Sequence, residues 1–380
     1  MSEVPPEFDL TQLPNLKSLK FDLCVPLSSP CTNMERLEFR GMYPEDWQRH
    51  PGDFGLLLPS LRELTFHSTQ DFTVYWPDIV LPSTLTSLTR LQSLTISHCS
   101  GLSRLPEGFG NLRALQTLVL RNLSLSNLPD SILHPSALET LVLHTLPLSR
   151  LSDSICQLTS LKTLVMFHLP LSFLPNTVCQ LTSLETFILI DCNGNTQGTI
   201  QLPETFCFLT ALQTLCVARM PQLRLPEDIG KLFKLQTVFL DGLLQQPRLP
   251  STFTQLSSLT RLELSGCMIQ VLPDNLGDLT NLQELHICSC PALLYLPETL
   301  TRLSSLDTLV VEGCRRLDSF PKSLESLRKL KWLESIRGKG QGIVDLPATS
   351  LRSKLGKLVV ASPVKACPRI WWEKNAWPTW

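Results

Sequence analysis

The 13 cysteines are the residues best suited to chemistry in this chain, since thiolates bind metals and act as nucleophiles. The spacing of these cysteines follows a sequence repeat and does not match the spacing of metal ligands. Eight share two recurring positions, namely Cys99, Cys192, Cys267, Cys290 and Cys314 in one and Cys156, Cys179 and Cys207 in the other. Cys288 and Cys290 form a CxC pair near His286, but Cys290 occupies the recurring turn position of the repeat, so the pair is not interpreted as a zinc site. We therefore predict no metal site.

Histidines are the second group with chemical potential. Five of the seven fall on positions expected to face outward from strands: His67, His98, His144, His168 and His286. No nucleophile or acid pair accompanies them at a defined spacing, so a catalytic triad has no basis. The glycine-rich stretch from Arg337 to Gly342 lacks the GxxxxGK[ST] spacing of a phosphate loop and is interpreted as a flexible loop. The sequence predicts a protein without enzymatic activity or cofactor.

A repeat determines where all these residues must lie. The pattern LxxLxxLxLxxC and its close variants recur mostly every 23 or 24 residues, beginning at Leu88, Leu112, Pro135, Leu158, Leu181, Leu209, Leu232, Leu256, Leu279, Leu303 and Leu327. Three looser copies begin at Leu13, Cys31 and Leu58. Most regular units carry a Leu-Pro pair about 17 residues after their start, although Leu151-Ser152 has lost its proline.

Each unit is expected to form a strand, a turn and a short helical or 3₁₀ return. In Leu141-Val142-Leu143 the two leucines face one way and the valine the other. One unit cannot fold alone, because a buried leucine contributes roughly 1.5–3 kcal/mol whereas ordering a residue costs about 1–2 kcal/mol. Stacking must therefore supply the stability. The predicted fold is an α/β solenoid, a curved horseshoe with a parallel sheet on the concave face and short helices or 3₁₀ turns on the convex face.

The units from Leu279 to Pro297 and from Leu303 to Pro321 resemble intracellular leucine-rich repeats. They are similar to those of plant disease-resistance receptors and of Ras-group scaffold proteins, and some bacterial type III effectors carry similar repeats. The resemblance covers nearly the whole chain and implies a binding platform, not a particular partner. The nucleotide-binding domain of the receptors is missing, so a fragment of a larger receptor or effector is one alternative interpretation.

Three regions are predicted along the chain: irregular repeats with aromatic insertions at 1–87, regular repeats at 88–360, and a tryptophan-rich cap or tail at 361–380. The insertions carry Tyr43, Trp47, Phe54, Phe72, Tyr75 and Trp76. They are interpreted as a cap on the open end of the solenoid, with a partner site as the alternative. The tryptophans Trp371, Trp372, Trp377 and Trp380 are likewise interpreted as a cap on the last repeat.

Charge and composition limit the classes of partner that the chain is expected to bind. The net charge of −1 argues against a general nucleic-acid binder, and no apolar run is long enough to span a membrane. Residues 315–374 hold 14 Lys and Arg against 5 Asp and Glu. This basic end is an alternative docking element for an acidic protein, RNA or an anionic membrane surface. The absence of a signal segment and the odd cysteine count favour a reducing cytoplasmic location.

The outward strand positions are where partner specificity is expected, because the repeat itself does not constrain them. A central column is apolar in six successive units, followed by Glu263 and His286, and its members are Val119, Val142, Val165, Ile188, Cys216 and Phe239. A neighbouring column holds Arg121, His144, Phe167, Ile190, Ala218 and Asp241. We predict an exposed apolar patch in the central column, joined by Phe167 and Ile190 and rimmed by Arg121, His144, His168, Asp191, Arg219 and Asp241. A protein partner is predicted to bind there, in signalling or in plant defence.

Overall fold

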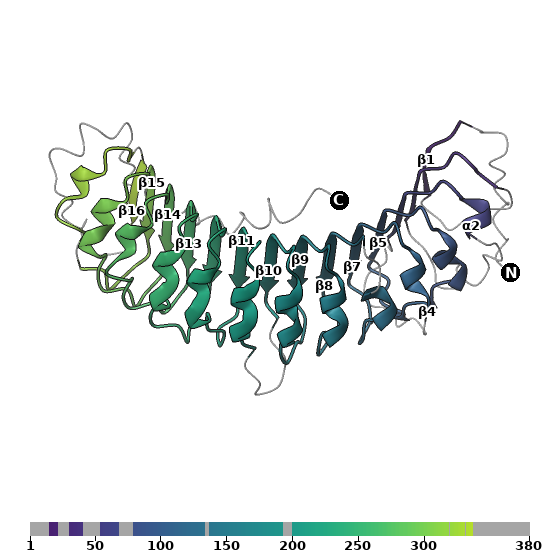
Figure 1. The fold of residues 1–380 in the computed structure, drawn as a ribbon, viewed down its shortest axis with the longest axis horizontal. Helices are drawn as coiled ribbons and strands as arrows, with labels where there is room; N and C mark the ends of the chain where they lie inside the picture. Colours follow the sequence, from purple (N-terminus) through teal and green to yellow (C-terminus); the bar gives the residue numbers. More distant parts are fainter. Residues whose placement is uncertain are drawn as a thin grey trace. The chain divides into compact units, whose positions relative to one another are not determined.

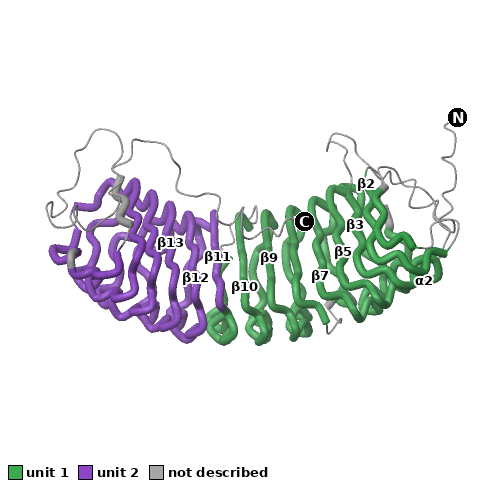
Figure 2. Tube along the Cα trace, turned by 90° about the horizontal axis from the view of Figure 1, so that it is seen from above, with its two compact units in different colours: residues 1–212 green, residues 213–380 purple. Residues whose placement is uncertain are grey.

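The structure is a computed structural model, which describes residues 15–21, 30–40, 54–67, 79–133, 137–192, 200–318, 320–330 and 332–336. It divides into two compact units, residues 1–212 and residues 213–380 (Figure 2). Each is a stack of similar repeats (Figure 1). The predicted boundaries at 87/88 and 360/361 follow the regularity of the repeats, and they stay predictions.

Within unit 1, strands alternate with short helical segments. The strands of the main sheet are β1 (Ser18–Phe21), β2 (Arg36–Arg40), β3 (Glu63–His67), β5 (Ser93–Ser97), β7 (Thr117–Arg121), β8 (Thr140–His144), β9 (Thr163–Phe167) and β10 (Thr186–Ile190). A small second sheet pairs β4 (Ile79–Val80) with β6 (Leu102–Arg104). The helical segments are α2 (Phe54–Leu57) and the 3₁₀ helices η2 (Ser83–Ser87), η3 (Phe109–Asn111), η4 (Asp130–Leu133), η5 (Asp153–Gln157), η6 (Asn176–Gln180) and η7 (Glu204–Phe208).

Unit 2 repeats the same plan. Its strands are β11 (Thr214–Ala218), β12 (Thr237–Asp241), β13 (Arg261–Ser265), β14 (Glu284–Cys288), β15 (Thr308–Glu312) and β16 (Trp332–Ile336). Its 3₁₀ helices are η8 (Glu227–Lys231), η9 (Ser251–Gln255), η10 (Leu276–Asp278), η11 (Glu298–Arg302) and η12 (Leu324–Ser326). In both units the strands pair in parallel with their sequence neighbours in the main sheet, which confirms the predicted stacking.

The register places equivalent residues side by side. Thr117, Leu118 and Val119 pair with Thr140, Leu141 and Val142, and the same offset continues into the next strand. Strand leucines such as Leu118 and Leu120 are fully buried and form one face of the sheet, which packs toward the helical segments. The residues between them project from the opposite face, called here the outer face. Within each unit no described helix or strand lies over that face (Figure 1).

The regular repeats return through 3₁₀ helices, and in several of them a proline precedes the first helical residue. Pro175, Pro203, Pro226 and Pro297 stand directly before η6, η7, η8 and η11 in extended backbone. In the repeat that lacks proline, the Ser152 hydroxyl accepts a hydrogen bond from Ser154 N at 3.3 Å and caps η5 instead. The predicted helical return is thus confirmed as 3₁₀ in the regular repeats.

Several predictions fall outside the described residues. These are the roles of Tyr43, Trp47, Phe72, Tyr75 and Trp76 in the first repeats and of the tryptophans after residue 370. Most of the basic segment and the glycine-rich stretch at 337–342 lie there too. Phe54 is described and is 3% exposed, and the interpretation of the insertions as a cap stays a prediction.

Candidate functional site

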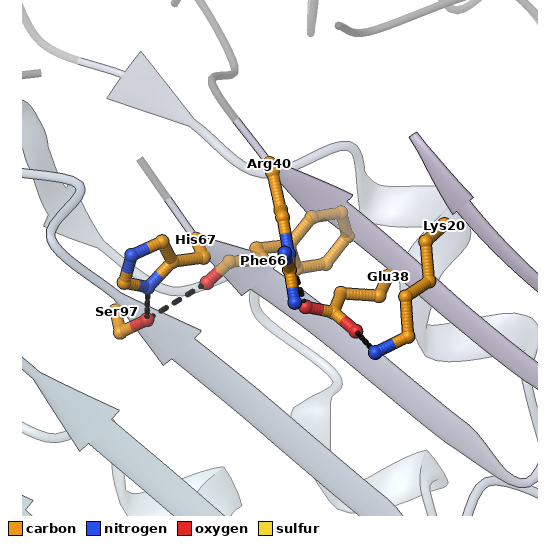
Figure 3. A network of polar contacts seen from close by, with 6 residues as sticks. All are labelled: Lys20, Glu38, Arg40, Phe66, His67 and Ser97. Atoms are coloured by element: carbon orange, nitrogen blue, oxygen red, sulfur yellow. Dashed lines mark hydrogen bonds and ion pairs between the residues drawn. The ribbon is translucent and has the colours of Figure 1, made fainter. Parts of the chain in front are cut away.

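The outer face of unit 1 begins with polar strands. Lys20 Nζ lies 2.7 Å from Glu38 Oε2, and Arg40 Nε lies 2.6 Å from Glu38 Oε1 (Figure 3). Burial alone would raise the pKa of Glu38, but the two cations hold it below its usual value. On the following strands His67 Nδ1 bonds Ser97 Oγ at 2.8 Å, and Ser97 Oγ donates to the Phe66 carbonyl at 3.2 Å. The central column continues through Thr65 and Thr95, so it is polar up to β5.

The central column becomes apolar at Val119 and stays so to the end of unit 1. Val119, Val142, Val165 and Ile188 pair in register across β7 to β10, on the face opposite the leucine core. Their exposed fractions are 7%, 9%, 5% and 5%. The expected placement on the outer face is therefore correct, but the expected broad water-exposed patch is not found. Neighbouring strands lie about 4.8 Å apart, so adjacent side chains in a column cover one another.

The neighbouring column supplies the rim of this face. His144 stacks on Phe167 with ring centroids 4.5 Å apart, and His168 Nδ1 lies 3.1 Å from Asp191 Oδ2. His168 is the more accessible, with 58% of its side chain exposed, whereas Ile190 is 1% exposed. Burial and the nearby Arg121 guanidinium lower the pKa of His144 to about 4. His144 is therefore neutral at physiological pH and contacts its surroundings as a flat, weakly polar ring.

Strand ends beside this rim adopt left-handed backbone. Asn122, Thr145, His168 and Asp191 have φ between 51° and 54°, a conformation that strains a side chain with a Cβ. The conformation lets the peptide N–H keep bonding to the next strand while the chain turns, as when Thr145 N donates to the Phe167 carbonyl at 2.8 Å. The same turn has positive φ in other repeats, at His98, Arg219, Gly242, Gly266, Ser289 and Gly313, so this conformation belongs to the repeat. Sequence reasoning missed Asn122 and Thr145, because periodicity alone does not reveal φ.

Unit 2 presents a different outer face. Cys216, Phe239 and Ala218 are 0%, 4% and 1% exposed, so the predicted apolar residues of this unit are also largely covered. Asp241 lies at the end of β12, and Arg219 is the exposed left-handed residue that follows β11. The central column then turns polar at Glu263 and His286, as the sequence indicates.

The cysteines behave as structural residues. Cys192 Sγ lies 3.3 Å from the Ile190 carbonyl and Cys267 Sγ lies 3.2 Å from the Ser265 carbonyl, so these thiols cap the turn that follows each strand. Burial raises the pKa of Cys192 to about 12, which removes thiolate reactivity. Among the described residues, no three His, Cys, Asp or Glu side chains are grouped to hold a metal. Cys288 is disulfide-bonded, which differs from the reduced state predicted for the cysteines.

Comparison with known proteins agrees with this architecture. Residues 204–371 match a family model described as a leucine-rich repeat region. A leucine-rich-repeat protein of Leptospira interrogans is similar in structure, with 26% identity and a TM-score of 0.68 over 86% of this chain and 80% of that one. The fold is a leucine-rich-repeat solenoid. No curated protein matches the sequence.

Two further solved structures share the leucine-rich-repeat fold. An internalin of Listeria monocytogenes has 18% identity and a TM-score of 0.57, covering 84% of this chain and 86% of that one. PEPR1, in the structure PEPR1-AtPEP1, has 21% identity and the same TM-score, covering 85% of this chain but 46% of that one. At these identities the similarity shows the fold alone. The finer resemblance to disease-resistance receptors or Ras-group scaffolds stays a prediction.

The helices in the described part of the chain are short. None has the length and apolar character needed to cross a bilayer.

Proposed function

We propose that this leucine-rich-repeat protein is a non-enzymatic interaction module that holds a protein partner on the outer face of its sheet. Its setting would be intracellular signalling or defence. The observation that carries the proposal is the rim of unit 1. There, His144, Phe167 and His168 line one side of an apolar column on a face that no described element covers.

Several physical features support this use of the rim. Aromatic and charged side chains at the edge of a packed apolar floor resemble the composition of protein interfaces. The floor is rigid, because its valines are tightly packed and bonded in register across β7 to β10. A rigid platform loses little conformational entropy on binding. Beside the rim, the left-handed residues His168 and Asp191 form a pair, with His168 Nδ1 3.1 Å from Asp191 Oδ2.

Phe167→Ala tests the proposal, with Phe173→Ala as the matched control. Phe173 lies six residues later in the same repeat, is 52% exposed and sits outside the sheet, before η6. Removal of an aromatic anchor at an interface costs about 2 kcal/mol or more, which is more than a tenfold loss of affinity. Affinity capture of tagged chains from the native cell, quantified by mass spectrometry, measures the loss.

A partner enriched by the wild type and by Phe173→Ala, but lost with Phe167→Ala and with His168→Ala, is the expected outcome. Thermal melts of all three variants check that the solenoid remains folded, since the stack of Phe167 on His144 contributes only about 1 kcal/mol. Equal capture by the wild type, Phe167→Ala and His168→Ala would exclude the rim as the binding site.

A further inference from the structure

Glu263 occupies an unusual place for a carboxylate. It lies in the central column of unit 2, paired in register with Phe239 on β12 and His286 on β14. Its neighbours along the strand, Leu262 and Leu264, are buried in the core, so Glu263 projects from the outer face. Even so, it is 1% exposed. A glutamate this deeply buried is normally paired and hydrogen-bonded.

The partners of this carboxylate are incomplete among the described residues. Arg261 Nη2 lies 3.6 Å from Glu263 Oε2, beyond hydrogen-bond distance, while Arg261 Nη1 lies 2.8 Å from Glu284 Oε2. Glu263 Oε2 and His286 Nε2 are both buried and have no hydrogen-bond partner in the described part of the chain, since the Glu284 Oε2 atom nearest the imidazole lies 3.7 Å from His286 Nε2. Two adjacent strands therefore present unsatisfied polar atoms at equivalent positions.

Burial shapes the protonation of both groups. It raises the pKa of Glu263 to about 7, against the opposing influence of Arg261 and reinforced by Asp241 and Glu284. It lowers the pKa of His286 to about 4, and Arg261 acts in the same direction. Near pH 7 Glu263 is thus divided between its acid and its carboxylate, and His286 is neutral. A neutral imidazole with its proton on Nδ1 offers Nε2 as an acceptor.

The surroundings select the charge of a ligand. Outer positions of β12 to β15 hold Asp241, Glu263, Glu284 and Glu312 against Arg261. An anionic ligand would be repelled here, whereas a cation is attracted. The exposed fractions of the Arg261 and Glu284 side chains are 21% and 38%, so these two long chains lie between Glu263 and the solvent, and a ligand that reaches Glu263 has to displace them. A planar guanidinium carries several N–H donors and can serve neighbouring acceptors at once.

We propose that Glu263 and His286 form a docking site for an arginine side chain of a protein partner. The site rests on the proposed function, since it gives that partner a chemistry: a basic segment laid along the outer face of unit 2. The guanidinium would donate to Glu263 Oε2 and to His286 Nε2, supplying the hydrogen bonds that the described residues leave unmade. Glu284 at the rim would add attraction to the incoming charge.

Synthetic peptides of defined charge test this site directly. A twelve-residue peptide alternating glycine and arginine is titrated into the full chain by calorimetry, beside lysine and glutamate versions. We expect the arginine peptide to bind, the lysine peptide to bind more weakly and the glutamate peptide not to bind. Glu263→Gln should weaken the arginine peptide at least tenfold. Glu227→Gln makes the same charge change on the exposed side chain of η8 and should leave affinity unchanged.

Proton linkage gives a second readout. The cation favours the carboxylate form of Glu263, which rises from about 10% at pH 6 to about 90% at pH 8 for a pKa near 7. Affinity of the arginine peptide should therefore increase about tenfold over this range. The dependence should vanish in Glu263→Gln. The titratable and charged groups facing Glu263 from its own and adjacent strands are Arg261, Glu284, Asp241 and His286, and a pKa of about 4 keeps His286 neutral across this range.

The outcomes separate this site from the proposed function. Unchanged affinity in Glu263→Gln, an equal loss in Glu227→Gln, or no binding of the arginine peptide would overturn the arginine site. A Glu263 carboxyl that titrates below pH 5 without probe, followed by carbon NMR, would assign the site to a cation of this same chain and also overturn it. A cellular partner retained by Glu263→Gln but lost with Phe167→Ala would leave the proposed function intact.

Discussion

Gly230, near the end of η8, is a position where one added methyl group should have a measurable cost. A Cβ built there would overlap the Thr252 carbonyl oxygen of the next repeat and lie 2.9 Å from Thr252 Cβ. Carbon–oxygen contacts normally lie at about 3.3–3.6 Å, so the two repeats would have to separate. In the three preceding repeats the equivalent helical position holds Cys156, Cys179 and Cys207, so a Cβ fits there, whereas at Gly230 the backbone of the next helix comes too close for one.

The change in the free energy of unfolding expected for Gly230→Ala is the sum of one stabilising and two destabilising contributions. Replacing a helical glycine by alanine stabilises a protein by about 0.5–1 kcal/mol when the space is free. Overpacking against backbone costs about 1–3 kcal/mol, and the hydrogen bond from Gly230 N to Thr252 Oγ1, at 3.1 Å, contributes about 1 kcal/mol more if it is lost. The net expectation for Gly230→Ala is a loss of about 2 kcal/mol in the free energy of unfolding.

Urea unfolding followed by circular dichroism measures this loss. With a slope of about 3 kcal/mol per molar urea, the midpoint should fall by about 0.7 M. Gly277→Ala should behave alike, because its Cβ would overlap the Thr299 carbonyl in the same way. Cys207→Ala serves as the control for alanine at this helical position. An unchanged or raised midpoint for Gly230→Ala would refute the claim that close approach of neighbouring repeats requires glycine here.

Three further predictions concern the core, the buried acid and the strand ends. Phe187→Ala should lower the free energy of unfolding by about 3–5 kcal/mol, because Phe187 is fully buried against Phe206, whereas Phe173→Ala should change it by less than about 0.5 kcal/mol in the same urea titration. The pKa of Glu263 is raised from 4.5 to about 7, so the stability that its protonated form contributes is complete below pH 4.5 and is lost as pH rises through 7. The free energy of unfolding of Glu263→Gln, measured by urea titration at each pH, should equal that of the wild type at pH 4.5 and exceed it by about 3 kcal/mol above pH 7.5. A difference that stays constant with pH would contradict this. Thr145→Gly should raise the melting temperature, since a left-handed threonine costs about 1 kcal/mol, and a lower melting temperature would show that its hydroxyl contact with His144 Nδ1 at 2.8 Å outweighs the strain.

The fold was predictable because a fixed leucine spacing leaves one way to bury its apolar residues. Leu141 and Leu143 lie inward and Val142 outward, as alternation requires, and Cys192 caps its turn as its repeat position indicates. The sequence predicted where the candidate site lies, but not how much of each side chain in it is exposed to solvent. Val165 is 5% exposed because its covering depends on the side chains of neighbouring strands, which one strand's pattern does not report.

The burial of Glu263 also could not be predicted from the pattern of one strand. Its position in the outer column was evident from the repeat, yet its burial and its unmade hydrogen bond depend on how Arg261 divides its guanidinium between two carboxylates. Left-handed strand ends were also outside the reach of periodicity, because histidine, asparagine, threonine and aspartate there replace the glycine found at Gly242, Gly266 and Gly313.

Within unit 2, the strands of the main sheet pair only with their sequence neighbours, so geometry is passed along the stack one step at a time. One additional repeat, inserted between β13 and β14, would preserve each existing loop and leave the inner leucines aligned. It would nevertheless move His286 one strand spacing, about 4.8 Å, further from Glu263. The distance between two side chains on different strands is thus set by the number of repeats between them. Gain or loss of a whole repeat can therefore create or destroy a site that spans two strands, while the fold stays the same.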